Sequence, residues 1–131
     1  MKKLLTAAFA LGLSMLASGA HADPVEGRWR TQPDDNGNFG VIEISACGNR
    51  FCGVLIESRR SNGEAFQSEN QGRQIVWDME PRGSGQYRNG QIWAPDRDET
   101  YRSRMDLAGD RLTVAGCVLF ICREQVWTRA D

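Results

Sequence analysis

The chain has 131 residues, with 16 basic and 17 acidic side chains and a formal net charge of −1. This length fits one domain with a single core. The balanced charge argues against nucleic acid as a partner, because proteins that hold nucleic acid carry a basic surplus.

The first 22 residues are predicted to be a cleavable export signal. Two lysines precede an apolar run over 4–17, and the pattern AHA, which suits a signal peptidase, ends at residue 22. A retained membrane anchor is the alternative, but the apolar run is short for a span. We therefore expect a signal peptide over 1–22 and a β-barrel domain over 23–131, located in the periplasm with no transmembrane segment after processing.

Removal of the signal leaves a chain with neither lysine nor histidine. The remainder keeps 14 arginines against 17 acidic residues. A Ser-His-Asp or Cys-His nucleophile system, a histidine zinc site and a Schiff-base lysine are therefore excluded. A hydrolase run by carboxylates would need Asp78, Glu80 and Asp96 to converge in a cleft. We expect no enzymatic activity, no cofactor and no metal ion.

Short segments with strand character follow one another along the rest of the chain, separated by turn signals. The expected strands are VEGRWRT (25–31), FGVIEISAC (39–47), CGVLIES (52–58), RQIVWDME (73–80), GSGQYRNG with QIWAP (83–95), ETYRSRMDL (99–107), RLTVAGC (111–117) and CREQVWTR (122–129). Apolar and polar residues alternate in these segments, as in half-buried strands. The residues expected to face the core include Ile42, Ile44, Ala46, Ile75, Trp77, Met79, Tyr101, Ser103, Met105 and Leu107.

About eight strands with short sequential turns and no helix between them predict an all-β fold. The expected architecture is a single antiparallel up-and-down barrel or half-barrel. The polar segment 58–72 has no helical stripe and is expected to form a long loop.

The four cysteines form two copies of C-x4-C, at Cys47 and Cys52 and at Cys117 and Cys122. In one extended strand, residues i and i+5 point to opposite faces, so the chain has to turn between the two sulfurs of a bonded pair. A four-residue hairpin loop would make each pair direct cross-strand partners. We expect two disulfides, each across its own hairpin; a four-thiolate metal site is the alternative, which an oxidising compartment disfavours.

The loop of the second cysteine hairpin is strongly apolar. Val118, Leu119 and Phe120 lie between the two sulfurs, and a loop this short cannot bury all its side chains against its own strands. We expect these three residues to be partly exposed at one end of the barrel and to contact a partner or a ligand. In the alternative, the 58–72 loop folds over them.

Five large side chains on expected inner faces are candidates to line a cavity for an apolar ligand. They are Trp77, Met79, Trp93, Tyr101 and Met105. The alternative is that an eight-stranded barrel fills itself with side chains, so that these residues are simply its core.

The chain resembles a bacterial family catalogued as domain of unknown function 2147, which comprises small exported proteins. The matching motifs are Gly27-x-Trp29, CGNRFCG (47–53), NGQIWAP (89–95), ETY (99–101) and an ending over 112–129 that contains LTVAGCV and Q-x-WTR. The turn after Pro95 departs from the family pattern, with Asp98-Glu99 in place of Gly-Lys. The resemblance implies a lipocalin-like β-barrel and an exported location, and it carries no assigned activity.

Trp29 and Arg129 are the expected closure of such a barrel. Its first and last strands are neighbours, so the arginine could lie over the indole face and shut the base of the barrel. A solvated Arg129 beside a core Trp29 is the alternative. Together, these observations predict a monomeric, non-enzymatic binding protein for a small apolar ligand or an envelope component; the alternative is a protein–protein interaction or hydrolase-inhibitor module.

Overall fold

The computed structural model describes residues 22–131, which form nine β-strands and no α-helix. The predicted signal peptide lies outside these residues except for its last one. Within the described range, no helix is long and apolar enough to cross a membrane. The strands are β1 (Gly27–Arg30), β2 (Phe39–Cys47), β3 (Arg50–Arg59), β4 (Ala65–Phe66), β5 (Gln74–Gly83), β6 (Gln86–Ala94), β7 (Glu99–Ala108), β8 (Arg111–Val118) and β9 (Ile121–Arg129).

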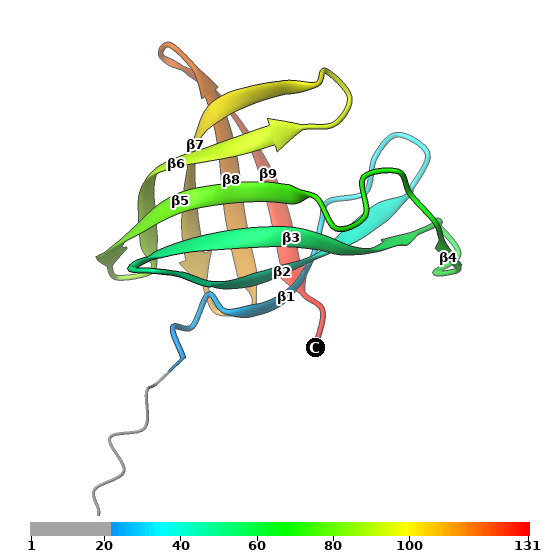
Figure 1. The fold of residues 1–131 in the computed structure, drawn as a ribbon, viewed down its shortest axis with the longest axis horizontal. Helices are drawn as coiled ribbons and strands as arrows, with labels where there is room; N and C mark the ends of the chain where they lie inside the picture. Colours follow the sequence, from blue (N-terminus) through cyan, green and yellow to red (C-terminus); the bar gives the residue numbers. More distant parts are fainter. Residues whose placement is uncertain (1–21) are drawn as a thin grey trace, which may run out of the picture.

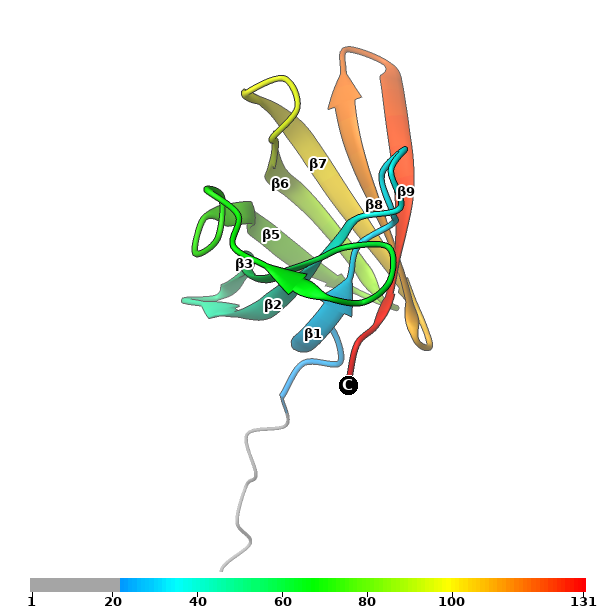
Figure 2. The same ribbon diagram turned by 90° about the vertical axis from the view of Figure 1, so that its right-hand side faces the viewer.

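The strands form a closed antiparallel barrel of eight strands with one short extra strand (Figures 1 and 2). Neighbours in the sheet follow the order β2-β1-β9-β8-β7-β6-β5-β3-β4, and pairing of β2 with β3 closes the ring. The extra strand, β4, pairs only with the end of β3. The prediction of an up-and-down barrel is therefore confirmed, and closure removes the open sheet edges that invite aggregation.

Strand β5 departs from the predicted alternation of buried and exposed residues. Val76, expected to point outward, is fully buried and pairs with Gly53, while Trp77 is half-buried and pairs with exposed Gln91. The pairing of β5 with β3 shifts register twice, and Asp78 has a positive φ of 56°. Each bulge inserts one unpaired residue and reverses the faces that follow it, which strict alternation does not anticipate.

Both predicted disulfides are present, but the hairpins that they span are tighter than expected. Each turn has two residues instead of four. In the first hairpin, Gly48 occupies the turn with a φ of +66°. Cys47 pairs with Arg50 across this turn, and it therefore lies diagonally across from Cys52, which pairs with Ser45. In the second hairpin, the two cysteines are direct cross-strand partners, as predicted.

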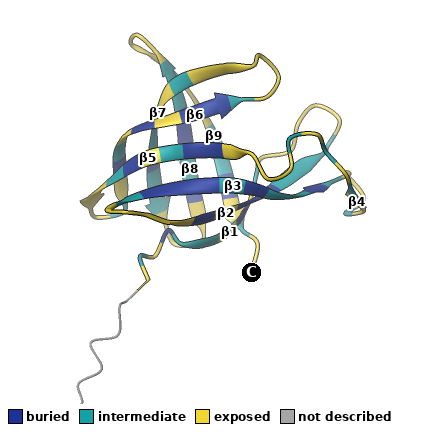
Figure 3. Ribbon diagram, viewed as in Figure 1, coloured by how far each residue is buried: buried dark blue, intermediate teal, exposed yellow. Residues whose placement is uncertain are grey.

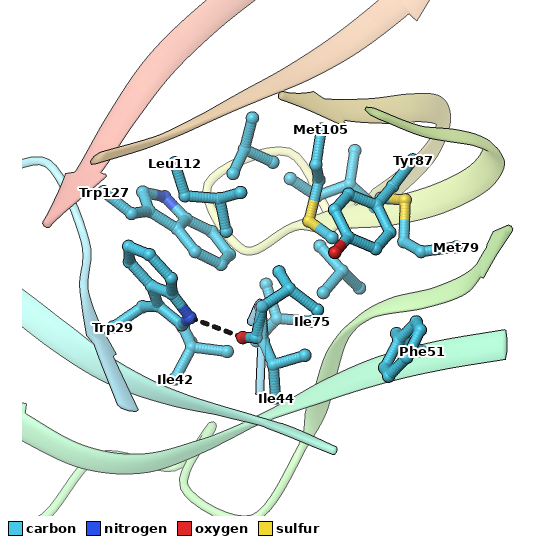
Figure 4. Packing of buried hydrophobic residues seen from close by; sticks show 14 of the residues in the cluster. Trp29, Ile42, Ile44, Phe51, Ile75, Met79, Tyr87, Met105, Leu112 and Trp127 are labelled. Atoms are coloured by element: carbon cyan, nitrogen blue, oxygen red, sulfur yellow. Dashed lines mark hydrogen bonds between the residues drawn. The ribbon is translucent and has the colours of Figure 1, made fainter. Parts of the chain in front are cut away.

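Large side chains fill the barrel interior (Figures 3 and 4). Met79 and Met105 are fully buried beside Tyr87, and Gly90 lies directly against the Met79 sulfur, with no room for a Cβ atom between them. At Gly53 a Cβ atom would lie 2.8 Å from a methyl group of Ile42. The interior at this level is therefore packed to contact, as expected for a small barrel that fills itself.

The base of the barrel is sealed by the segment before β1. The Arg129 guanidinium lies 3.9 Å from the centre of the Trp29 ring, which is the arrangement that we expected. It also donates hydrogen bonds to the carbonyl oxygens of Glu26 at 2.9 Å and Pro24 at 2.7 Å. The Trp29 indole donates in turn to the carbonyl of Val25 at 2.8 Å, so first and last strands are locked together with this segment.

Candidate functional site

The two ends of the barrel differ in the size of their connections. Short turns at 48–49, 84–85 and 109–110 lie at the base, whereas the longer segments 31–38 and 60–73 lie at the opposite end (Figure 1). We call this opposite end the loop end. It also carries the β6–β7 connection and the turn between β8 and β9. Loops held by a rigid scaffold are where binding residues concentrate, so the loop end is the natural place for a site.

Four consecutive apolar residues project from the loop end. The exposed fractions are 55% for Val118, 86% for Leu119, 100% for Phe120 and 76% for Ile121. We call these residues the apolar tip. Within residues 22–131 they are the only large apolar side chains that are exposed. The predicted exposure of this turn is confirmed, and the alternative that the 58–72 segment covers it is wrong (Figure 3).

The disulfide and the apolar tip occupy defined faces of the β8–β9 hairpin. Gly116, two residues below Val118, is packed against Ile92 of the interior, so alternation places Val118 and its partner Ile121 on the inner side. The two sulfurs therefore face outward. The disulfide ties the strands one residue pair below the tip, which holds the tip in a fixed position.

Arg104 braces the outer side of this hairpin from the neighbouring strand β7. Its guanidinium lies 3.1 Å from the sulfur of Cys122 and 3.7 Å from that of Cys117. The other arm of the guanidinium bonds Glu124 of β9 at 3.2 Å. Three strands are thus connected just below the tip, which limits its motion.

The five side chains that we expected to line a cavity belong to the packed interior. Met79, Trp93 and Met105 lie in the core cluster, and the half-buried Trp77 and Tyr101 pack against it. Neither of the two hollows described below contains any of the five.

Two of the five lie near the loop end, and each carries a polar contact. Trp93 is stacked beneath Arg73 at 3.3 Å, and its indole donates to Asp98 at 2.9 Å. Tyr101 is half-buried, and its hydroxyl donates to Glu99 at 2.7 Å. This hydrogen bond raises the pKa of the Tyr101 hydroxyl. Trp93 is buried and Tyr101 is half-buried, whereas both methionines are fully buried.

A shallow hollow of about 390 Å³ lies on the outer face of β1, β2 and β3. Its walls are mostly basic and apolar: Arg28, Arg30, Phe39, Val41, Glu57, Arg59, Arg129 and Ala130. The guanidinium of Arg30 stacks on Phe39 at 3.7 Å. Sequence reasoning missed this hollow, although alternation about the buried Trp29 already places Arg28 and Arg30 on the outer face. A second hollow, of about 200 Å³, lies beside β4.

The carboxylates considered for hydrolysis do not form a cleft. Asp78 and Asp96 are exposed, and Glu80 forms ion pairs with Arg50 at 3.7 Å and Arg82 at 3.3 Å. In the described part of the chain, no three His, Cys, Asp or Glu side chains are grouped so that they could hold a metal ion.

Comparison with known proteins agrees with this geometry. A family model described as "Uncharacterized protein conserved in bacteria (DUF2147)" matches residues 27–129. No curated protein matches the chain. Among solved structures, the fold is similar to that of a Helicobacter pylori protein described as belonging to the lipocalin family, with a TM-score of 0.65 and 15% identity over 81% of this chain and 82% of the other. At this identity the likeness shows a lipocalin-like fold.

Proposed function

The chain belongs to the DUF2147 family of proteins conserved in bacteria, and from this premise we propose that it is a non-enzymatic binding protein of the cell envelope. In this proposal it is exported to the periplasm, where an oxidising environment keeps both disulfides formed. It attaches to an apolar envelope component through the apolar tip at the loop end.

The exposure of the apolar tip is the observation that carries this proposal. Burial of one large apolar side chain is worth about 1.5–3 kcal/mol, and the free protein forgoes this for all four residues of the tip. The disulfide and Arg104 already fix the hairpin, so little conformational entropy remains to be lost on binding. A rigid, solvent-exposed apolar surface is typical of a binding site.

A small apolar ligand enclosed at the barrel centre is less well supported by the geometry. Gly90 touches the Met79 sulfur, so a ligand at that level would have to displace core side chains. If the barrel holds a small ligand, we propose that it lies near Tyr101 at the loop end, below the apolar tip. Native mass spectrometry of the protein purified from its own periplasm would detect a retained ligand.

Photocrosslinking in living cells tests the attachment through the tip. A photoreactive residue at position 120 is expected to give covalent adducts with an envelope component. The same residue at position 49, in the exposed turn of the other cysteine hairpin, serves as the matched control and is expected to give none. Equal or absent adducts at the two positions would refute the proposed function.

An interaction module, such as an inhibitor of a secreted hydrolase, is the second candidate. The observation in its favour is the tight two-residue turn. It exposes the side chains of Leu119 and Phe120 on a narrow projection, which is a suitable shape for insertion into the cleft of a partner protein. A single protein adduct at position 120 that disappears when a hydrolase inhibitor fills the partner's cleft would favour this candidate.

A further inference from the structure

Resting on the proposed function, we propose that the envelope component is the surface of a phospholipid bilayer. The apolar tip inserts among the acyl chains close to the headgroups, and arginines below it bind lipid phosphates. The argument depends on the shape of the hairpin, on the charges beside it and on the area that it can bury.

The hairpin places apolar and cationic groups at two different heights. The Val118–Ile121 pair lies at the top, the Cys117–Cys122 pair lies next, and the Gly116–Arg123 pair lies below that. Successive pairs are about 3.3 Å apart along a strand, so Arg123 starts roughly 7 Å below the last apolar pair. Amphipathic segments at membranes bury their apolar face by about 5–10 Å, which matches this separation.

Two arginines below the tip, one level with the cysteine pair and one level with the next pair down, are available for an anionic partner. Arg102 pairs with Cys117 on the outer side, and Arg123 pairs with Gly116 on the inner side. Both are exposed, and neither forms an ion pair with another side chain in the part of the chain that the structure describes. With Arg104, which pairs with Glu124, three arginines lie on the strands just below the tip. Guanidinium groups bind phosphate through paired hydrogen bonds, so these arginines are suited to bind the phosphate groups of lipids.

The backbone at Leu119 indicates that an apolar residue is retained there against local preference. Five residues other than glycine have positive φ in the described chain. Four of them, Asp78, Ser84, Asn89 and Asp98, are small polar types, of which Asp and Asn tolerate this region best. The fifth is Leu119, at +54°, where Asn or Gly would suit the turn better.

The limited area of the tip favours a bilayer over a protein partner. Four side chains bury roughly 500 Å² at most, whereas a stable protein interface needs about 800 Å² from each partner. A bilayer has no such minimum, because each inserted side chain gains apolar surroundings independently. The acidic residues Asp96, Asp98 and Glu99 in the neighbouring loop would be repelled by anionic lipid, which confines insertion to the tip.

Vesicle flotation of the intact, disulfide-bonded chain 23–131 tests the inference. We expect the protein to float with vesicles that contain phosphatidylglycerol and to bind phosphatidylcholine vesicles more weakly. Phe120→Ser with Leu119→Asn should reduce binding at least tenfold. Arg102→Gln with Arg123→Gln should reduce binding to anionic vesicles about tenfold and leave binding to phosphatidylcholine unchanged.

Arg111→Gln is the matched control, because Arg111 is an exposed strand arginine at the other end of β8. Its binding should equal that of the unchanged protein. A second readout is Phe120→Trp, whose fluorescence should shift to the blue when anionic vesicles are added. No flotation, or equal flotation of the tip variant, would overturn the inference.

The two proposals fail in distinguishable ways. Absence of flotation together with a protein adduct at position 120 in cells would overturn the bilayer and leave attachment through the tip intact. Lipid adducts at position 120 together with flotation would support both. Absence of any adduct at position 120 would refute the proposed function itself, and with it the bilayer.

Discussion

Replacement of Leu119 by asparagine should stabilise the protein while weakening the proposed attachment through the tip. Leu119 has a φ of +54° and is 86% exposed. A left-handed conformation costs a residue with a branched, bulky side chain about 1–2 kcal/mol, and asparagine tolerates it far better. Removal of the leucine loses few contacts in the folded state, because the side chain is already in water.

The expected gain is about 1 kcal/mol in the free energy of unfolding. For a domain of this size, that corresponds to a rise in Tm of about 4 °C. Thermal and urea unfolding with both disulfides intact would measure it. The reverse exchange, Asn89→Leu, places leucine at another exposed position with a φ of 60° and should lower stability by about 1 kcal/mol.

Phe120→Ser is the control for the loss of apolar surface alone. Phe120 is fully exposed and lacks a positive φ, so its replacement should change stability by less than about 0.5 kcal/mol. If Leu119→Asn lowers stability, the leucine makes stabilising contacts in the folded protein, and the argument from backbone strain is refuted. A variant that is more stable but binds less would show that Leu119 contributes to binding at the expense of stability.

Three further substitutions test the packing of the barrel. Arg129→Ala should lower the free energy of unfolding by about 2–3 kcal/mol, because it removes the stacking on Trp29 and two hydrogen bonds to the segment before β1; an unchanged urea midpoint would contradict this. Burial, and then the hydrogen bond to Asp23, raise the pKa of Tyr87 above its usual value near 10, so stability should be complete below pH 10 and fall as the pH rises further. Tyr87→Phe should flatten that fall, and an unaltered pH dependence would exclude Tyr87 as its source. Gly90→Ala should lower stability by about 1–3 kcal/mol, because the added methyl group meets the buried methionine sulfur; a neutral effect would show that the core yields there.

The sequence predicted the barrel and its cysteine hairpins because both depend on local signals. Alternation identified the strands, and the C-x4-C spacing required a turn between the sulfurs. Ile75 and Met79 of β5 are buried as predicted, but Val76 and Trp77 were mispredicted, because the bulge at Asp78 depends on pairing with β3, a partner that local alternation does not reveal. The exposure of the apolar tip was predicted, but the partial exposure of Trp77, which pairs with exposed Gln91, was not.

The closure between β1 and β9 sets the order in which the molecule can be assembled. Trp29 pairs with Arg129, so the contacts that seal the ring join residues 100 positions apart in the chain. Each strand of the ring up to β9 can pair with the strand before it as soon as both are made, whereas the pairing of β1 with β9 waits until Thr128 and Arg129 have left the ribosome. Until then the sheet has two unpaired edges, at β1 and at the most recently completed strand, and these are the edges that a protease or another copy of the chain would meet. Removal of Thr128 and Arg129 therefore acts on the whole ring, because it leaves the edges of β1 and β9 unpaired permanently.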